Sequence, residues 1–135
     1  MNRTETVEFG HVGERLVQSE LESRGYPVQF TADHKTHDLE IGSLRIEVKI
    51  SRARYLYGHN HGYHFLIQHP NKSAHAPADV FILVCSRDDR IEFFVIPNSA
   101  IATRRSVKIT MLDQNQYNGK WKPYLNNFGV LGAIV

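Results

Sequence analysis

Two short segments of alternating apolar and polar residues, joined by Gly42-Ser43, constrain the fold of this chain more than any other feature. A two-residue turn that begins with Gly, between alternating segments, is typical of a β-hairpin with a type II′ turn. The two members of every cross-strand pair must then add to the same number. Ile41 therefore faces Leu44, and at the other end of the hairpin Asp38 faces Glu47, so two carboxylates are predicted to be cross-strand neighbours.

The same alternation divides the hairpin into an apolar face and a polar face, because successive strand side chains point to opposite sides. The apolar face comprises Leu39, Ile41, Leu44, Ile46, Val48 and Ile50, and the polar face comprises Asp38, Glu40, Arg45, Glu47 and Lys49. A polar face that merely contacts water is a common alternative in antiparallel sheets. Like charges directly opposite each other, however, cost up to about 1 kcal/mol. A cation bound between Asp38 and Glu47 would remove that repulsion.

The polar face has the components of a phosphodiester hydrolase. Two carboxylates with β-carbons about 5 Å apart can share Mg²⁺ or Mn²⁺, which prefer oxygen ligands and retain water. Lys49 lies two residues beyond Glu47, about 7 Å along the same face. An ammonium group there could orient a metal-bound water or stabilise a developing negative charge. The hairpin thus predicts a metal-dependent hydrolytic site.

Asp38 together with Glu47-Val48-Lys49 resembles the motif of the PD-(D/E)XK nuclease superfamily, in which an Asp precedes an acid, any residue and Lys on the next strand. His37 stands where that motif has Pro. The resemblance implies that Asp38 and Glu47 bind metal, that the Val48 carbonyl adds a ligand, and that Lys49 assists the attacking water. It also implies 5′-phosphate and 3′-hydroxyl products.

The segment before the hairpin extends the resemblance. Residues 13–17, followed by Leu21 and residues 25–28, are similar to the first helix and strand of archaeal Holliday-junction resolvases. The resemblance implies that Glu14 supports the metal site. On a helix Glu14 stacks with Val17 and Leu21 and borders the apolar stripe. Glu20 is expected nearer the centre of the stripe and is the second candidate, and a purely structural Glu14 is the alternative.

The remaining pattern predicts an α/β fold in a single domain, residues 1–135. We expect a helix over residues 6–24, and strands at 28–32, 78–85, 91–96 and 107–112, with a loop at 52–64, a short helix entered at 97–99, and an apolar end at 130–135 that packs on the core or on a second subunit. Residues 65–67, 78–84 and 92–97 are similar to later strands of PD-(D/E)XK homing endonucleases. The resemblance implies a restriction-endonuclease-like mixed central β-sheet flanked by helices.

Candidate DNA contacts follow the catalytic strand. Guanidinium and aromatic groups beside a nuclease site suit a DNA backbone, and the candidates are Arg52, Arg54, Tyr55 and Tyr57. A solvated loop is the alternative. Further basic clusters lie at residues 104–108 and 120–122. There, Trp121 and Tyr124 are expected to be core or dimer anchors.

Composition excludes little but agrees with a folded protein. Of the 135 residues 41% are hydrophobic and 22% charged, and the net charge of +2 is compatible with nucleic acid without indicating it. The polar amino terminus and short apolar runs predict a cytoplasmic protein without a membrane span. Cys85, in an apolar run, is expected to be buried and inert.

The function expected from these observations is Mg²⁺- or Mn²⁺-dependent cleavage of DNA. The substrate class stays open between a branched junction and a sequence-specific duplex. A homodimer is expected because two strands need two active sites. The alternatives are a catalytically silent DNA-binding module on a nuclease fold and a metal-free structural domain.

Overall fold

Three helices, a 3-10 turn and eight strands make up the part of the chain that the structure describes. The computed structural model describes residues 2–31, 38–57, 60–67, 78–87, 90–101, 104–111, 117 and 119–134, and for 54–57, 60–61 and 133–134 it describes the backbone alone. In chain order the elements are α1 (Arg3–Ser23), β1 (Gln29–Phe30), β2 (Leu39–Ile41), β3 (Leu44–Arg52), β4 (Arg54–Tyr57), β5 (Asn60–Leu66), β6 (Val80–Arg87), β7 (Arg90–Pro97), α2 (Asn98–Ile101), β8 (Ser106–Thr110), η1 (Lys122–Tyr124) and α3 (Gly129–Ile134).

The strands form two sheets. The larger has five strands in the order β1-β2-β3-β6-β7, and the smaller has three in the order β4-β5-β8. In the large sheet β3 and β6 run parallel, whereas the other neighbours are antiparallel. The expected α/β fold with a mixed central sheet is therefore confirmed.

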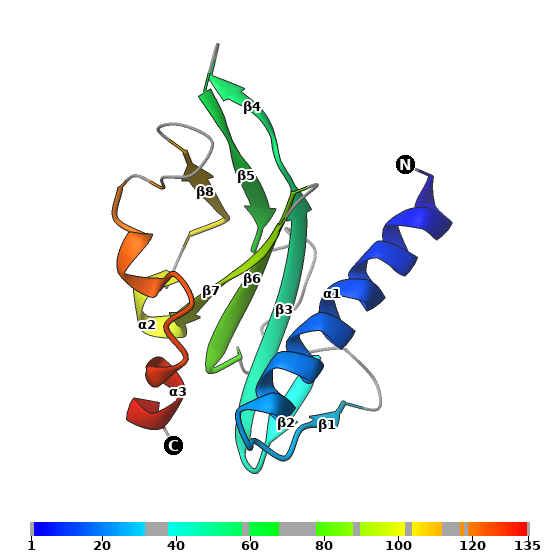
Figure 1. Cartoon of the computed structure of the whole chain (residues 1–135), viewed down its shortest axis with the longest axis vertical. Coiled ribbons are helices and arrows are strands. Elements are labelled where there is room, and N and C mark those ends of the chain that lie inside the picture. Colours follow the sequence, from blue (N-terminus) through cyan, green and yellow to red (C-terminus); the bar gives the residue numbers. More distant parts are fainter. Residues whose placement is uncertain are drawn as a thin grey trace.

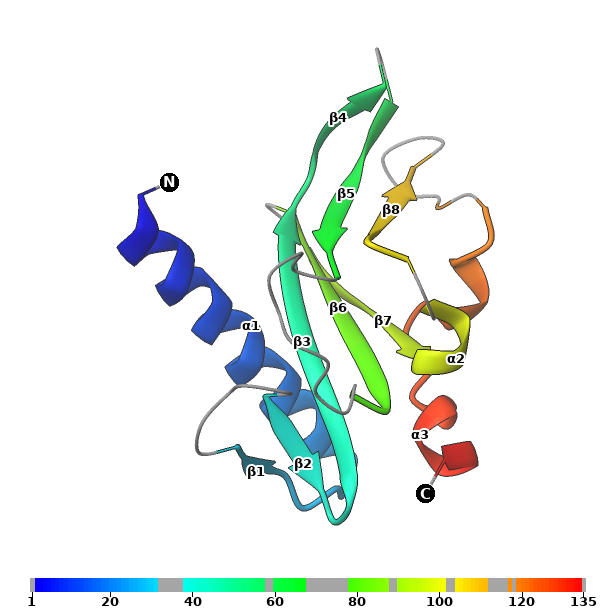
Figure 2. The same ribbon diagram turned by 180° about the vertical axis from the view of Figure 1, so that it is seen from behind.

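Strand β6 lies at the centre of the molecule and is buried on both faces. Val80, Ile82 and Val84 pack in one apolar cluster with residues of α1 and α3. Their neighbours Phe81, Leu83 and Cys85 pack in a second cluster with residues of β5 and β8. The helices α1 and α3 thus cover one face of the large sheet, and the small sheet covers the other (Figures 1 and 2). Cys85 is buried, as expected, and burial raises the pKa of its thiol well above the usual value.

Helix α1 uses only part of its length to cover the sheet. Its buried residues are Gly13, Glu14, Val17 and Leu21. The amino-terminal half, capped by the Asn2 side chain, which accepts a 2.8 Å hydrogen bond from the Glu5 N–H, extends beyond this core contact (Figure 1). Val12, although apolar, is 42% exposed.

A glycine sets the distance between α1 and β3. A β-carbon added at Gly13 would lie 3.0 Å from Cβ and 3.2 Å from Cγ2 of Ile50, closer than such atoms normally approach. Gly13 therefore allows a helix–strand contact that a larger residue would open. The residue after it, Glu14, is held close to the sheet as a result.

The predicted hairpin pairing is confirmed for the residues of β2 that pair with β3. Gly42 has φ of 59°, as the predicted turn requires, and Leu39, Glu40 and Ile41 pair with Ile46, Arg45 and Leu44. The apolar face of the hairpin lies in the cluster beneath α1, with Ile50 partly buried at its edge.

Residues 52–64 depart from the sequence prediction, which made them a loop. The structure has a β-hairpin there, formed by β4 and β5, and β5 pairs in turn with β8. The pairing with a strand some forty residues later supplies a stability that local composition cannot reveal.

At the carboxyl end, Trp121 is 5% exposed and belongs to the core, as expected, and Leu131 is fully buried. No helix among the described residues is long and apolar enough to cross a membrane.

Candidate active site

The hairpin register changes at Asp38. Continued by one pair, the ladder would place Asp38 directly opposite Glu47, as the sequence predicted. Instead the Asp38 N–H donates a 2.9 Å hydrogen bond to the carbonyl of Ile46, the residue that already faces Leu39. The Asp38 carbonyl accepts from Thr31 N–H at 3.0 Å. Asp38 and Glu47 are therefore not a ladder pair, because β2 begins to leave β3 at this point.

The departure of β2 turns the Asp38 side chain towards the edge of β3. The Asp38 carboxylate, 8% exposed, accepts a 2.8 Å hydrogen bond from the Val48 N–H. The N–H and carbonyl of one strand residue point to the same side, as the paired hydrogen bonds of a ladder require. Ile46, two residues earlier, directs its carbonyl to this edge. The Val48 carbonyl therefore also points to the edge where Asp38 lies.

Glu47 and Lys49 lie on the opposite face of β3 from α1, since they alternate with the buried Ile46 and Val48. The Lys49 ammonium lies 3.7 Å from the Glu47 carboxylate, and the side chains are 31% and 14% exposed. The predicted acid and lysine are thus in ionic contact. Because both side chains reach solvent, Lys49 and Glu47 can exchange this contact for another charged group, such as a cation or a phosphate.

Glu14 approaches from the helix side. It is 9% exposed, and His11, one turn earlier, places its Nδ1 3.6 Å from the Glu14 carboxylate. Glu20 is elsewhere: it accepts a 3.1 Å hydrogen bond from the Ser23 hydroxyl and lies 3.8 Å from Arg24 near the carboxyl end of α1. The expectation that Glu20 lies nearer the centre of the buried stripe is wrong, and Glu14 is the helix carboxylate beside the hairpin.

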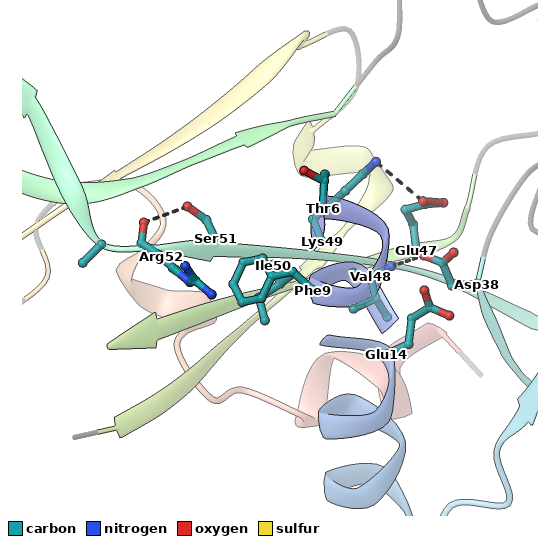
Figure 3. Close-up of a pocket in the computed structure, with 12 residues that line it drawn as sticks. Thr6, Phe9, Glu14, Asp38, Glu47, Val48, Lys49, Ile50, Ser51 and Arg52 are labelled. Atoms are coloured by element: carbon teal, nitrogen blue, oxygen red, sulfur yellow. Dashed lines mark hydrogen bonds and ion pairs between the residues drawn. The ribbon is translucent and has the colours of Figure 1, made fainter. Parts of the chain in front are cut away.

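These groups line one cleft of about 540 Å³. Its walls are Thr6, Phe9, Gly10 and Glu14 of α1, residues 47–52 of β3, Asp38 and Ala53. In Figure 3 the carboxylates of Glu14, Asp38 and Glu47 gather at one end, and Arg52 lies at the other. The cleft follows the β3 edge that β2 has left.

The carboxylate end suits a divalent cation with few protein ligands. Within the described ranges, no three His, Cys, Asp or Glu side chains stand close enough together to hold one ion. Mg²⁺ usually takes only one or two carboxylates and completes its shell with water and substrate oxygens. Asp38 and Glu47, with the carbonyl of Val48, which follows Glu47 in sequence, fit that requirement, and Glu14 could hold a water or a second ion.

Of the four expected DNA contacts, Arg52 can be placed. It is exposed at the end of β3, and its guanidinium lies 4.6 Å from the centre of the Phe9 ring. Arg54, Tyr55 and Tyr57 belong to β4, and their side chains lie outside the described part of the structure.

The contribution of α1 to the cleft beyond Glu14 was not predicted from the sequence. Thr6, Phe9, Gly10 and Glu14 share the helical face that continues into Val17 and Leu21. The signal was present in the spacing, since positions i, i+3, i+4 and i+8 lie on one side of a helix. One stripe of α1 is therefore cleft wall in its first half and core in its second.

Known proteins share this architecture at low sequence identity. Neither the known protein-family profiles nor the curated proteins include a match to the chain. Among solved structures, a bacterial homing endonuclease has a similar fold. That protein, I-Ssp6803I, superposes with a TM-score of 0.66 over 96% of this chain and 93% of its own, at 14% identity. The likeness establishes the fold: a mixed sheet flanked by helices.

Proposed function

We propose that this protein is an endonuclease that hydrolyses DNA phosphodiester bonds with Mg²⁺ or Mn²⁺. The observation that carries the proposal is the meeting of Glu14, Asp38, Glu47 and Lys49 in one cleft. The fold shared with a bacterial homing endonuclease supports DNA as the substrate. The match of Asp38 and Glu47-Val48-Lys49 to the PD-(D/E)XK motif supports this chemistry.

Each side chain has a role that follows from its position. Asp38 and Glu47 would hold the cation, with the Val48 carbonyl directed to the same edge. The cation, when bound, lowers the pKa of a coordinated water and neutralises charge on the phosphate. Lys49 exchanges its contact with Glu47 for the attacking water or a phosphate oxygen, and so stabilises developing negative charge. Glu14 orients a water or supports a second ion.

Buried Asp38 is prepared for this role by its hydrogen bond. The Val48 N–H fixes one carboxylate oxygen at 2.8 Å and so fixes the direction of the whole group. Such a supporting bond holds a metal ligand in place before the ion arrives. The backbone of β3 is itself held by parallel pairing with β6, so the site rests on a rigid element.

The test is incubation of the purified protein with labelled four-way junction, duplex and single-stranded DNA in Mn²⁺, beside Glu47→Ala and EDTA controls. We expect cleavage by wild type alone, with 5′-phosphate ends. DNA binding without cutting of any substrate would instead favour a catalytically silent DNA-binding module. Preference for the junction over its linear arms would select the structure-specific activity, and cutting at one duplex sequence the sequence-specific one.

Metal binding has its own measurement. We expect calorimetry without DNA to show Mn²⁺ binding to wild type and weaker binding to Asp38→Asn. Equal binding by both proteins would exclude Asp38 as a ligand.

We further propose a homodimer on DNA, because cutting both strands of a duplex or junction needs two such clefts. Sedimentation of a monomer on DNA would contradict this last point.

A further inference from the structure

The half of the cleft away from the carboxylates has no part in the hydrolysis just described. It lies between the amino-terminal half of α1 and the end of β3. Its charged group is Arg52, and the walls between Arg52 and the carboxylates include Phe9 and Gly10. Figure 3 shows Arg52 and Phe9 at this end, away from Glu14, Asp38 and Glu47.

The distance to the carboxylates is too long for one phosphate. Arg52 follows Glu47 by five residues, which on a strand of about 3.3 Å per residue corresponds to about 16 Å. A phosphate at Asp38 and Glu47 is therefore out of reach of the Arg52 guanidinium. Whatever anion Arg52 binds in this cleft is a different group of the same ligand.

Phe9 fixes the direction of that guanidinium. The Arg52 Cζ lies 4.6 Å from the ring centre, and Phe9 is half-buried while Arg52 is exposed. A guanidinium stacked on an aromatic face keeps its N–H groups available at its rim. It loses less freedom on binding an anion than a free arginine does. Planar, two-pronged donation of this kind matches a phosphate.

At Gly10, the wall that α1 forms between the two ends of the cleft carries no side chain. A β-carbon placed on Gly10 would meet no described atom within 4 Å, so packing does not require glycine there. Glycine inside a helix is unfavourable compared with alanine. Glycine is used where a ligand must approach the backbone closely. Its position on the cleft face therefore points to a ligand that crosses α1 at Gly10.

We propose that this half of the cleft binds the phosphodiester backbone of the DNA strand flanking the scissile bond. The strand crosses Gly10, and a flanking phosphate binds Arg52. Phe9 is a positioning residue that acts through Arg52. The inference rests on the proposed function, because it takes the carboxylate end as the place of the scissile phosphate.

The experiment measures equilibrium binding of labelled duplex and junction DNA by fluorescence anisotropy in EDTA, over a range of salt. Loss of one phosphate contact lowers the slope of log K against log salt by about 0.9. We expect Arg52→Ala to lower the slope by that amount and to weaken binding about tenfold or more. Arg15→Ala removes an equal charge from the exposed outer side of α1 and is the matched control, expected to bind nearly as wild type.

Variants of α1 separate positioning from folding. Phe9→Ala should weaken binding about two- to fivefold, the strength of an exposed cation–π contact, and Phe9→Tyr should restore it. Gly10→Leu should raise the melting temperature, since leucine is a good helix former, and yet weaken binding. Ser19→Leu, on the exposed side of the same helix, controls for an added leucine.

The outcomes divide the two proposals. Unchanged affinity and salt slope in both Arg52→Ala and Gly10→Leu would overturn the proposal that this half of the cleft binds DNA, whether or not wild type cuts DNA. If these variants weaken DNA binding but wild type does not cut DNA, the proposal of DNA binding in this half of the cleft stands and the proposed endonuclease activity is rejected. Wild type that neither binds nor cuts DNA would reject both.

Discussion

The Asp38 carboxylate accepts a 2.8 Å hydrogen bond from the backbone N–H of Val48, at the point where β2 leaves β3. This bond gives Asp38 two functions. It satisfies the Val48 N–H at a strand edge that β2 no longer covers, and it fixes a carboxylate in the cleft. The two functions can be separated by substitution.

Asp38→Ala should destabilise the protein, and Asp38→Asn should not. Alanine leaves the Val48 N–H without its acceptor, which costs about 1–3 kcal/mol when the group is buried. Asparagine retains a carbonyl oxygen that can accept the same bond while removing the charge. Urea unfolding of the three proteins measures the difference. A loss of stability in Asp38→Asn as large as in Asp38→Ala would show that the charge, and not the hydrogen bond, maintains the edge.

Lys49→Ala should slow cleavage strongly, with little effect on stability. The contact with Glu47 is partly exposed, and such ion pairs contribute about 0–1 kcal/mol. Loss of a positioned proton donor or charge at the reacting group lowers the rate about 10²-fold or more. Single-turnover cleavage in Mn²⁺, with the melting temperature as control, gives both values. Normal cleavage by Lys49→Ala would remove this residue from the mechanism.

Gly13→Ala should be harmful although alanine favours helix. The new β-carbon would lie 3.0 Å from Ile50 Cβ, so α1 and β3 must adjust by a few tenths of an ångström. Overpacking of this kind costs about 1–3 kcal/mol. Gly10→Ala is the matched control, since the same methyl group there meets no described atom and should stabilise the helix by about 0.5–1 kcal/mol. Equal stabilities in urea would contradict the close contact.

The second apolar cluster predicts a loss of stability at alkaline pH. Burial raises the pKa of Tyr63 to about 12 from an ordinary value of 10. The native state then binds more protons than the unfolded state between these values. The stabilisation is complete below pH 10 and is lost as the pH rises through 12. Tyr63→Phe should reduce the slope of unfolding free energy against pH in this window, measured by urea unfolding. An unchanged slope would mean that Tyr63 ionises equally in both states.

The hairpin shows how far local pattern determines this fold and where it ceases to do so. Alternation around Gly42-Ser43 is a local property, and it correctly placed the three pairs from Ile41–Leu44 to Leu39–Ile46. The next pair failed at Asp38, where the Asp38 N–H bonds to the Ile46 carbonyl and the Asp38 carbonyl accepts from the Thr31 N–H at the end of β1. The carboxylates still meet in one cleft, although by another geometry.

For α1, too, the local pattern predicted only part of the arrangement. Helical spacing placed Glu14 beside Val17 and Leu21, but could not choose between Glu14 and Glu20. The choice depends on where α1 crosses β3, which the Gly13–Ile50 contact decides. Likewise β4 and the first part of β5 were not foreseen, because β5 is completed by pairing with β8 far along the chain.

The most direct test of the proposed metal-dependent cleavage is its rate in Mn²⁺ for wild type and for Glu47→Gln, prepared side by side and matched in melting temperature. Glutamine keeps the size of the side chain and removes the charge that would hold the cation. We expect metal-dependent cleavage by wild type that EDTA abolishes, and a rate at least about 10²-fold lower for Glu47→Gln. Equal cleavage by the two proteins would contradict this expectation.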